Sequence, residues 1–212
     1  MPQNLKIEVA ADVVCPWCYL GYARLQKALT LRPEVKAEIV WKPYQLRPEI
    51  PGEGADYKKM MAEKFDPERM KEIRRNMTAM GRDLGLNFDF DRIEISPNTN
   101  AAHRLIRWAA VQGKLDAVAM GVMKAFFEEG KNIGDENVLV EIAGAAGMDR
   151  ATVLENFRAG VDRDIVTAEY KAVQAEGISA VPHYKMGSVT VEGSWPAEDL
   201  AAEMDKALSK AA

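Results

Sequence analysis

The sequence predicts an α/β fold in which a small mixed sheet, built from both ends of the chain, carries a large all-helical insertion. Apolar and polar residues alternate in short segments before residue 50 and again after residue 177, as they do in half-buried strands. Helical spacing dominates between these two regions. The 212 residues are 48% hydrophobic and 28% charged, which is an ordinary globular balance and allows a sizeable core.

The first fifty residues predict a strand, a helix and a second strand. Residues 5–13 alternate, and residues 19–32 place apolar side chains close to helical spacing. Pro16 suits the first turn of this helix, where its missing N–H costs little, so we expect Cys15 at the N-cap. Residues 35–43 alternate again. This order favours a βαβ unit with parallel strands.

The middle of the chain predicts a loop followed by a succession of helices. Residues 46–57 are rich in Pro and Gly, which indicates a loop leaving the sheet. Asp66 followed by Pro67 is typical of a helix start, and Ser96 followed by Pro97 repeats it. Helical spacing then continues through residues 115–130, 136–147, 149–160 and 161–177.

The last part of the chain returns to strands and closes with a helix. Residues 178–187 and 188–193 are short alternating segments that meet at Gly187 and Ser188, which predicts a hairpin. Residues 195–211 predict a helix, for which Ser194 is a candidate N-cap.

These elements predict two units within the chain. Residues 1–50 and 178–212 form the sheet-containing unit, and residues 51–177 form an inserted helical unit. The net charge of −4 and the lack of a Lys/Arg cluster argue against a nucleic-acid partner. No apolar run approaches the ~20 residues of a membrane helix, and the N-terminus shows no secretory signal, so we expect a cytoplasmic protein with no membrane partner.

Cys15 and Cys18 are the two cysteines of the chain, and their spacing at a helix start is its strongest chemical signal. Both sulfurs fall on the first turn, where they can bond to each other. The free N–H groups of the helix N-terminus favour a thiolate on the first cysteine. The thiolate is the attacking species in disulfide exchange, and C-x-x-C beside a βαβ unit is typical of redox chemistry. Two alternatives are a pair of inert buried thiols and half of a zinc site shared by a dimer.

Metals and nucleotide cofactors are not expected. Two thiols cannot complete a four-ligand zinc site within one chain, and His103 and His183 are far away in sequence. The sequence contains no G-x-G-x-x-G segment and no Walker loop.

The motif and its context resemble a known family. Residues 15–21 (CPWCYLG), directly after a strand, look like the active site of the DsbA-like branch of the thioredoxin superfamily, and the long helical insertion is similar to that branch. Residues 177–182 (GISAVP) resemble the cis-proline loop of that family. Residues 98–99 and 102–104 resemble a helix start in cytoplasmic members related to the 2-hydroxychromene-2-carboxylate isomerases. The resemblance spans nearly the whole chain and implies a thioredoxin-like fold.

The resemblance implies unequal roles for the two cysteines. Cys15 would be the nucleophile and Cys18 the resolving thiol. Val181 and Pro182 would form a cis peptide facing them, and the Val181 backbone would pair with an extended substrate. Physical reasoning alone predicts a trans bond, because only about 5–6% of X-Pro bonds are cis in folded proteins.

The two residues between the cysteines bear on substrate contact and redox potential. Pro16 and Trp17 separate Cys15 from Cys18, and we expect Trp17 to be an exposed apolar platform beside the Cys15 thiol. The alternative is a half-buried aromatic with no substrate role. Trp17 supplies no hydrogen bond from a charged ring, unlike the His of the periplasmic oxidant, which argues against a strongly oxidising disulfide.

Asn98, His103 and Arg104 are candidate residues for the mouth of the redox cleft. In that position Arg104 could hold a substrate carboxylate. The alternative is that His103 is satisfied within the packing of its helix, whose apolar face includes Leu105 and Ile106.

The sequence therefore predicts a thiol–disulfide oxidoreductase that acts on a protein or small-molecule thiol or disulfide, with no resident cofactor. One rival is a glutathione-dependent isomerase or transferase of the chromene-carboxylate or kappa type, with glutathione as co-substrate. Those enzymes generally have Ser at the position of Cys15, so the cysteine pair favours redox chemistry. Another rival is a non-catalytic peptide-binding module around Trp17 and Pro182. The sequence specifies neither the natural substrate nor the oligomeric state.

Overall fold

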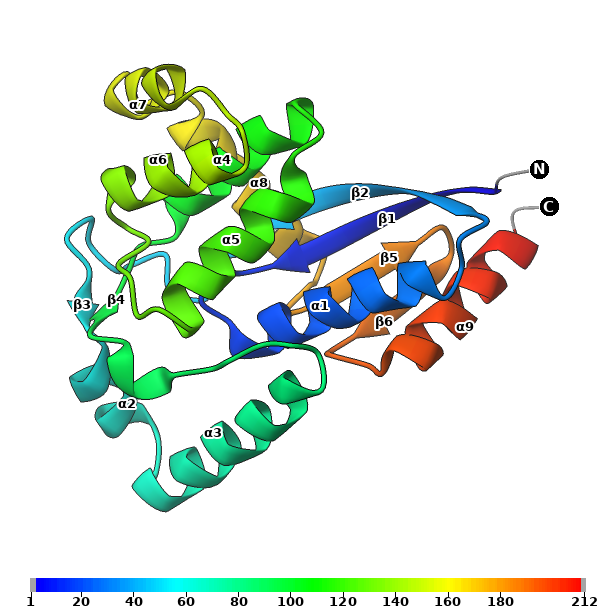
Figure 1. Ribbon diagram of the computed structural model, residues 1–212, viewed down its shortest axis with the longest axis horizontal. Coiled ribbons are helices and arrows are strands. Elements are labelled where there is room, and N and C mark those ends of the chain that lie inside the picture. The colour runs from blue at the N-terminus through cyan, green and yellow to red at the C-terminus, as the bar shows by residue number, and fades with distance from the viewer. Residues whose placement is uncertain (1–2, 211–212) are drawn as a thin grey trace.

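Residues 3–210, which the computed structural model describes, form a four-stranded mixed sheet with helices on both faces and a long helical insertion (Figure 1). The strand order is β2-β1-β5-β6. The strands span β1 (Gln3–Ala11), β2 (Val35–Pro43), β5 (His183–Met186) and β6 (Val189–Glu192).

Both ends of the chain contribute to this sheet, as the sequence predicts. β1 pairs in parallel with β2, with Ile7 opposite Ile39. On its other side β1 pairs antiparallel with β5, with Val9 opposite Tyr184. β5 and β6 form an antiparallel hairpin. The predicted βαβ unit and the hairpin at Gly187 are therefore confirmed.

The two faces of the sheet are covered by different helices. Ile7 and Val9 of β1 belong to the large hydrophobic cluster under α1 (Pro16–Thr30) and α9 (Ala197–Ser209). Ala10, which follows Val9, points to the other face and packs in a small cluster with Val173 of α8 (Arg163–Ala175). Figure 1 shows α1 and α9 in front of the sheet and α8 behind it. The two-residue period of β1 thus explains the layering.

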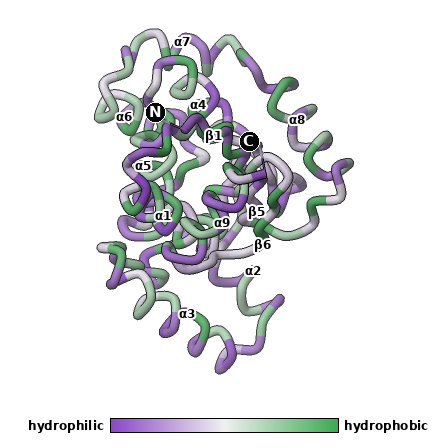
Figure 2. Tube along the Cα trace, turned by 90° about the vertical axis from the view of Figure 1, so that its right-hand side faces the viewer, coloured by the Kyte–Doolittle hydropathy of each residue, from purple (hydrophilic) through white to green (hydrophobic). Residues whose placement is uncertain are grey.

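The insertion is mostly helical and shares its core with the sheet. One hydrophobic cluster joins Val9 of the sheet to Phe126 of the insertion. The division of the chain into two units at residues 51 and 177 stays a prediction. The helices of the insertion that precede α8 are α2 (Tyr57–Lys64), α3 (Pro67–Arg82), α4 (Asn100–Val111), α5 (Leu115–Phe127), α6 (Glu136–Ala145) and α7 (Arg150–Arg158). In Figure 2, α2 and α3 extend away from the rest of the chain as an arm.

Two predicted helix starts are wrong. Ser96 does not begin a helix, because it pairs with Ala55 in a short ladder between β3 (Ala55–Asp56) and β4 (Ile95–Ser96). The helix begins instead at Asn100, whose N–H donates to the side chain of Asn98 at 3.0 Å. Ser194 does not cap α9 either. By contrast, Asp66 caps α3 as predicted, accepting from the Arg69 N–H at 2.9 Å.

The actual contact of Ser194 explains why it is not a cap. Its carbonyl and its hydroxyl both accept hydrogen bonds from Arg24 of α1, at 2.7 and 3.1 Å, and Pro196 takes the N-cap position. No helix within residues 3–210 is both long and apolar enough to cross a membrane.

Candidate active site

Cys15 stands where β1 gives way to α1, at the N-cap of that helix. Its N–H donates to the Asp12 carbonyl at 3.1 Å, and its own carbonyl accepts from the N–H groups of Cys18 and Tyr19 at 2.9 and 3.1 Å. Pro16 occupies the first helical position. The Cys15 side chain makes no hydrogen bond to the helix and lies at the positive end of the helix dipole.

The two cysteines have unequal environments. Both are free and buried thiols, 5% exposed at Cys15 and 1% at Cys18, but Cys15 lines a cavity and Cys18 does not. Burial raises the pKa of the Cys18 thiol well above its ordinary value, and the contact with Cys15 adds to this rise. Cys18 is therefore protonated at neutral pH.

The loop before β5 faces Cys15. The Val181–Pro182 peptide bond is cis. The Cys15 Sγ lies 3.8 Å from the Val181 carbonyl oxygen, which accepts from the thiol. The Pro182 carbonyl in turn accepts from the Gly193 N–H at 2.8 Å, which ties the loop to the end of β6. The structure thus brings Val181 and Cys15 together across 166 positions of sequence.

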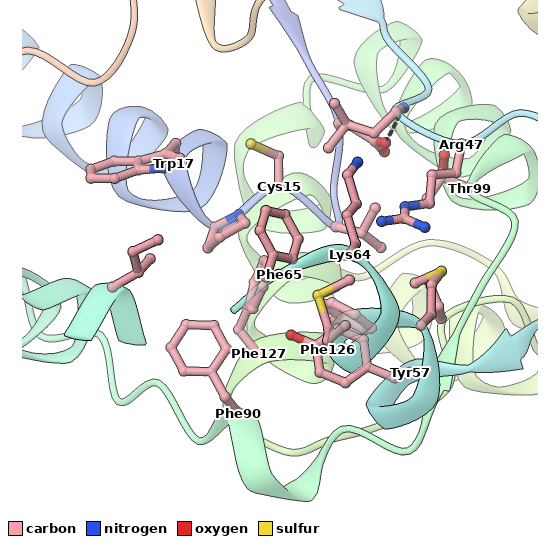
Figure 3. Close-up of a pocket in the computed structure, with 18 of the residues that line it drawn as sticks. Cys15, Trp17, Arg47, Tyr57, Lys64, Phe65, Phe90, Thr99, Phe126 and Phe127 are labelled. Atoms are coloured by element: carbon pink, nitrogen blue, oxygen red, sulfur yellow. Dashed lines mark hydrogen bonds between the residues drawn. The ribbon is translucent and has the colours of Figure 1, made fainter. Parts of the chain in front are cut away.

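The cavity beside Cys15 has a volume of about 430 Å³ (Figure 3). Trp17 lines it and is 42% exposed, and its role as an apolar platform for substrate stays a prediction. Much of the remaining lining comes from the segment after β2, from α2 and α3, from residues 90–99 and from the end of α5. Its aromatic and methionine members are Tyr57, Met60, Met61, Phe65, Met70, Met77, Phe90, Phe126 and Phe127.

Asp12 is a buried carboxylate of the site that motif reasoning does not identify. It lines the cavity, and its Oδ2 accepts from the Leu46 N–H at 2.8 Å. Its Oδ1 has no hydrogen-bond partner among the described residues and lies 3.4 Å from His103 Nε2. The signal in the sequence is an acidic residue set between apolar residues at the end of the first strand, three positions before Cys15.

His103 lies in the packing behind the cavity rather than at its mouth. It does not line the cavity. Its Nδ1 accepts from Trp41 Nε1 at 3.1 Å, so Nε2 carries the proton and donates to the Tyr44 carbonyl at 3.0 Å. The alternative of a histidine satisfied within the core therefore describes this residue, and its placement at the cleft mouth is wrong.

Asn98 and Arg104 are also absent from the lining of the cavity that holds Cys15. The Asn98 amide donates to the Ile50 carbonyl at 2.7 Å. Arg104 is 1% exposed and donates to the Val161 and Asn156 carbonyls at 2.6 and 3.1 Å. Arg104 thus stabilises the C-terminal end of α7 rather than a carboxylate beside the thiols.

Arg47, Lys64 and Arg74 complete the cavity and were not predicted from the sequence. Arg47 comes from a loop and Lys64 and Arg74 from the two arm helices, and none of the three belongs to a recognisable sequence motif.

Among residues 3–210, no group of three or more His, Cys, Asp or Glu side chains is placed to hold a metal ion.

Comparisons with known proteins agree with this geometry. Residues 6–205 match the model of the DsbA-like thioredoxin domain family. The chain is 28% identical over 192 residues to the uncharacterized protein YwbO of Bacillus subtilis (strain 168), covering 90% of this chain and 91% of that one. It is also similar to the crystal structure of a probable DsbA oxidoreductase from Streptomyces coelicolor, with a TM-score of 0.86, 25% identity and coverage of 97% and 91%.

A third comparison concerns the isomerase branch. A structure of 2-hydroxychromene-2-carboxylate isomerase matches with a TM-score of 0.69 and 14% identity, over 97% of this chain and 95% of that one, which shows a shared fold. The sheet formed by both chain ends, the Cys-Pro-Trp-Cys turn at the start of α1 and the facing cis-proline loop agree with the family match. The chain has a thioredoxin-like fold with a helical insertion and belongs to the family of DsbA-like thioredoxin domains.

Proposed function

We propose that this protein is a thiol–disulfide oxidoreductase in which Cys15 is the nucleophile and Cys18 the resolving thiol. The observation that carries the proposal is the asymmetry of two thiols on one helical turn. Cys15 lines a cavity at the helix N-terminus, and Cys18 is buried behind it with a raised pKa. A sulfur that faces a cavity and a second sulfur shielded from it are suited to a two-step exchange.

In the reducing direction, the Cys15 thiolate attacks one sulfur of a substrate disulfide and releases the other as a thiolate. Cys18 then gives up its proton and attacks the Cys15 sulfur. This forms the Cys15–Cys18 disulfide and releases the second substrate thiolate. Two electrons pass from the protein to the substrate. The oxidising direction reverses each step, and the thiolate of a substrate dithiol opens the protein disulfide.

The loop of Val181 and Pro182 is the proposed contact for an extended substrate. The Val181 carbonyl already accepts from the Cys15 thiol. A substrate strand bound along the Val181 backbone would therefore present its sulfur to Cys15. The exposed ring of Trp17, together with Pro16, offers apolar surface to the residues flanking that sulfur.

Two serine variants test the proposal. The wild type, Cys15→Ser and Cys18→Ser are each mixed with dithiothreitol and a reporter peptide closed by one disulfide. We expect the wild type to accelerate reduction of the peptide, Cys15→Ser to lose this activity, and Cys18→Ser to accumulate a mixed disulfide with the peptide. The chain has only these two cysteines, so no other thiol contributes. Exchange that survives Cys15→Ser would overturn the mechanism.

The same variants separate the two rival classes. Isomerase turnover that depends on glutathione and persists in both variants would assign the protein to the isomerase class. Reporter peptide that is bound but never reduced by the wild type would indicate a peptide-binding module. Replacing dithiothreitol by glutathione in the wild-type reaction tests glutathione as the co-substrate.

A further inference from the structure

The cavity beside Cys15 is mostly apolar, and the arm formed by α2 and α3 supplies much of its wall. In Figure 3 the rings of Phe65, Phe90, Phe126 and Phe127 lie below Cys15, on the side of the arm. A volume of about 430 Å³ falls in the range of small-molecule sites. Such walls favour a carbon skeleton over a polar peptide, because apolar surface is stabilised by removal from water.

Two cations line this cavity, of which Lys64 is exposed and Arg47 is half-buried. Figure 3 shows the Arg47 and Lys64 side chains pointing to the same region, near Thr99, with Cys15 on the far side of Lys64. Within residues 3–210, neither cation forms an ion pair. Asp12 also lines the cavity, but its carboxylate forms no ion pair with either cation: its Oδ2 accepts from the Leu46 N–H, and its Oδ1 lies 3.4 Å from His103 Nε2.

A third cation, Arg74, is already engaged. It pairs with Asp91 at 3.4 Å and lies over the rings of Tyr57 and Phe90, at 5.9 and 5.5 Å from their centroids. Arg74 therefore helps to form the wall. Lys64 lies over the Phe65 ring, 5.6 Å from its centroid, but like Arg47 it has no anionic partner among residues 3–210. An anion that enters with the ligand would form charge-assisted hydrogen bonds with these two cations, which have no anionic partner of their own among residues 3–210.

We propose that this cavity accepts a small apolar dithiol or disulfide that carries a carboxylate. Its sulfurs would meet Cys15, its carbon skeleton would pack on the methionine and phenylalanine side chains, and its carboxylate would bind Arg47 and Lys64. The inference rests on the proposed function and adds the substrate class. Oxidation of a bound dithiol balances without a further reactant, since two electrons and two protons pass to the Cys15–Cys18 disulfide and the ligand leaves as a disulfide.

The first experiment compares two dithiols that differ only in charge. Oxidised protein is mixed with dihydrolipoate or with its neutral amide, dihydrolipoamide, and the free protein thiols are alkylated and counted by mass at intervals. Both probes carry the same dithiol, so their intrinsic reactivity is matched. We expect dihydrolipoate to have a KM at least tenfold lower than dihydrolipoamide, with similar maximal rates.

The second experiment removes the two cations. Arg47→Gln combined with Lys64→Gln is expected to raise the KM for dihydrolipoate about tenfold and to leave that for dihydrolipoamide within about twofold. The matched control is Lys58→Gln combined with Lys59→Gln. It removes two charges from exposed positions of α2 that do not line the cavity, and should change neither KM. A rise in KM for dihydrolipoate of equal size in both pairs would overturn the inference, because only the overall charge of the protein would then matter.

A binding measurement separates this inference from the proposed function. The variant with both Cys15→Ser and Cys18→Ser is titrated with octanoate and with octanamide by calorimetry, since neither ligand contains sulfur. We expect octanoate to bind at least tenfold more tightly, and the preference to disappear with Arg47→Gln and Lys64→Gln. Octanoate binding without any disulfide exchange in the wild type would overturn the function and keep the site. Exchange without a preference for the carboxylate would overturn the site and keep the function.

Discussion

Gly21 of α1 and Tyr184 of β5 approach so closely that no side chain fits between them. A Cβ at position 21 would lie 2.5 Å from the Tyr184 hydroxyl oxygen and 2.9 Å from the Pro182 Cγ. Gly21 follows Cys18 by three positions, so the same contact seats the helix that carries the thiols against the loop that faces them. A glycine inside a helix has a propensity cost, and here the close approach requires it.

Gly21→Ala should therefore destabilise the protein by about 1–3 kcal/mol, although alanine has the higher helix propensity. The measurement is the free energy of unfolding in urea. Gly121→Ala in α5 is the matched control, since its Cβ would meet only the Ile142 Cγ2, at 3.1 Å, at the end of a side chain that can move. Equal stability of the two variants would contradict the packing argument.

Tyr184→Phe should restore part of the stability lost in Gly21→Ala. The Tyr184 hydroxyl is buried and has no hydrogen-bond partner among residues 3–210, so its removal alone should cost less than about 1 kcal/mol. In the double variant the nearest oxygen is gone. A coupling energy of about 1 kcal/mol in the double-mutant cycle is expected. If the free-energy changes of the two single variants simply add in the double variant, the Tyr184 hydroxyl is not the group that excludes the methyl group of Ala at position 21.

Arg104→Lys should destabilise the protein without changing the exchange rate of the folded fraction. The guanidinium donates to several backbone carbonyls at the end of α7, and a lysine cannot reproduce this fork. A loss of about 2–4 kcal/mol is expected for a buried charged donor. The readouts are urea unfolding and reporter reduction per folded molecule. A raised KM with unchanged stability would instead place Arg104 in a substrate site.

Iodoacetamide should modify one cysteine of the reduced, folded protein. Cys15 lines the cavity, whereas Cys18 is shielded and kept protonated by its raised pKa. At pH 7.5 we expect one adduct per chain, mapped to Cys15 by peptide mass analysis, and a second only after unfolding. Labelling of Cys18 in folded Cys15→Ser as fast as in the unfolded chain would contradict the assigned environments.

The stability of the reduced protein should fall as the pH rises above about 9. Burial holds the pKa of Cys18 in the folded state well above the unperturbed value of 9.0, so the unfolded chain releases this proton first. Stability then decreases with pH, by at most about 1.4 kcal/mol per pH unit for one group. Cys18→Ala should have a shallower slope between pH 9 and 10, below the unperturbed tyrosine value of 10.0. Identical slopes in urea unfolding would refute the raised pKa.

The sequence was most informative where chemistry and local structure coincide. Three features were predicted because each depends on residues that are neighbours in the sequence: the strand before Cys15, the helix start at the proline after it, and the hairpin at Gly187. The position of Val181 against Cys15 came from the family resemblance, because a contact across 166 positions leaves no local signal. Arg104 was misplaced for the same reason. The position of Arg104 in its helix predicts which face of the helix its side chain occupies. It does not predict that the guanidinium donates to carbonyls at the end of α7.

The cavity itself could not be predicted because its walls belong to six separate parts of the chain, residues 12–17, 46–50, 57–77, 90–99, 126–127 and 180–181. Met61 and Lys64 of α2 look like an ordinary amphipathic helix face in the sequence. Their proximity to Cys15 depends on where the arm folds back, which the short β3–β4 ladder at Ala55 and Ser96 helps to fix. Such a ladder of two residues is too short to show a period.

The arm formed by α2 and α3 has a consequence for how this protein could diversify. The cysteines and the facing loop belong to the sheet-containing part of the chain, whereas much of the wall that would select a ligand belongs to the arm. Substitutions in the arm could therefore change which ligand the protein prefers and leave the thiol–disulfide chemistry of the cysteines unchanged. Grafting the arm of one relative onto the body of another is accordingly a direct way to engineer new substrate preferences.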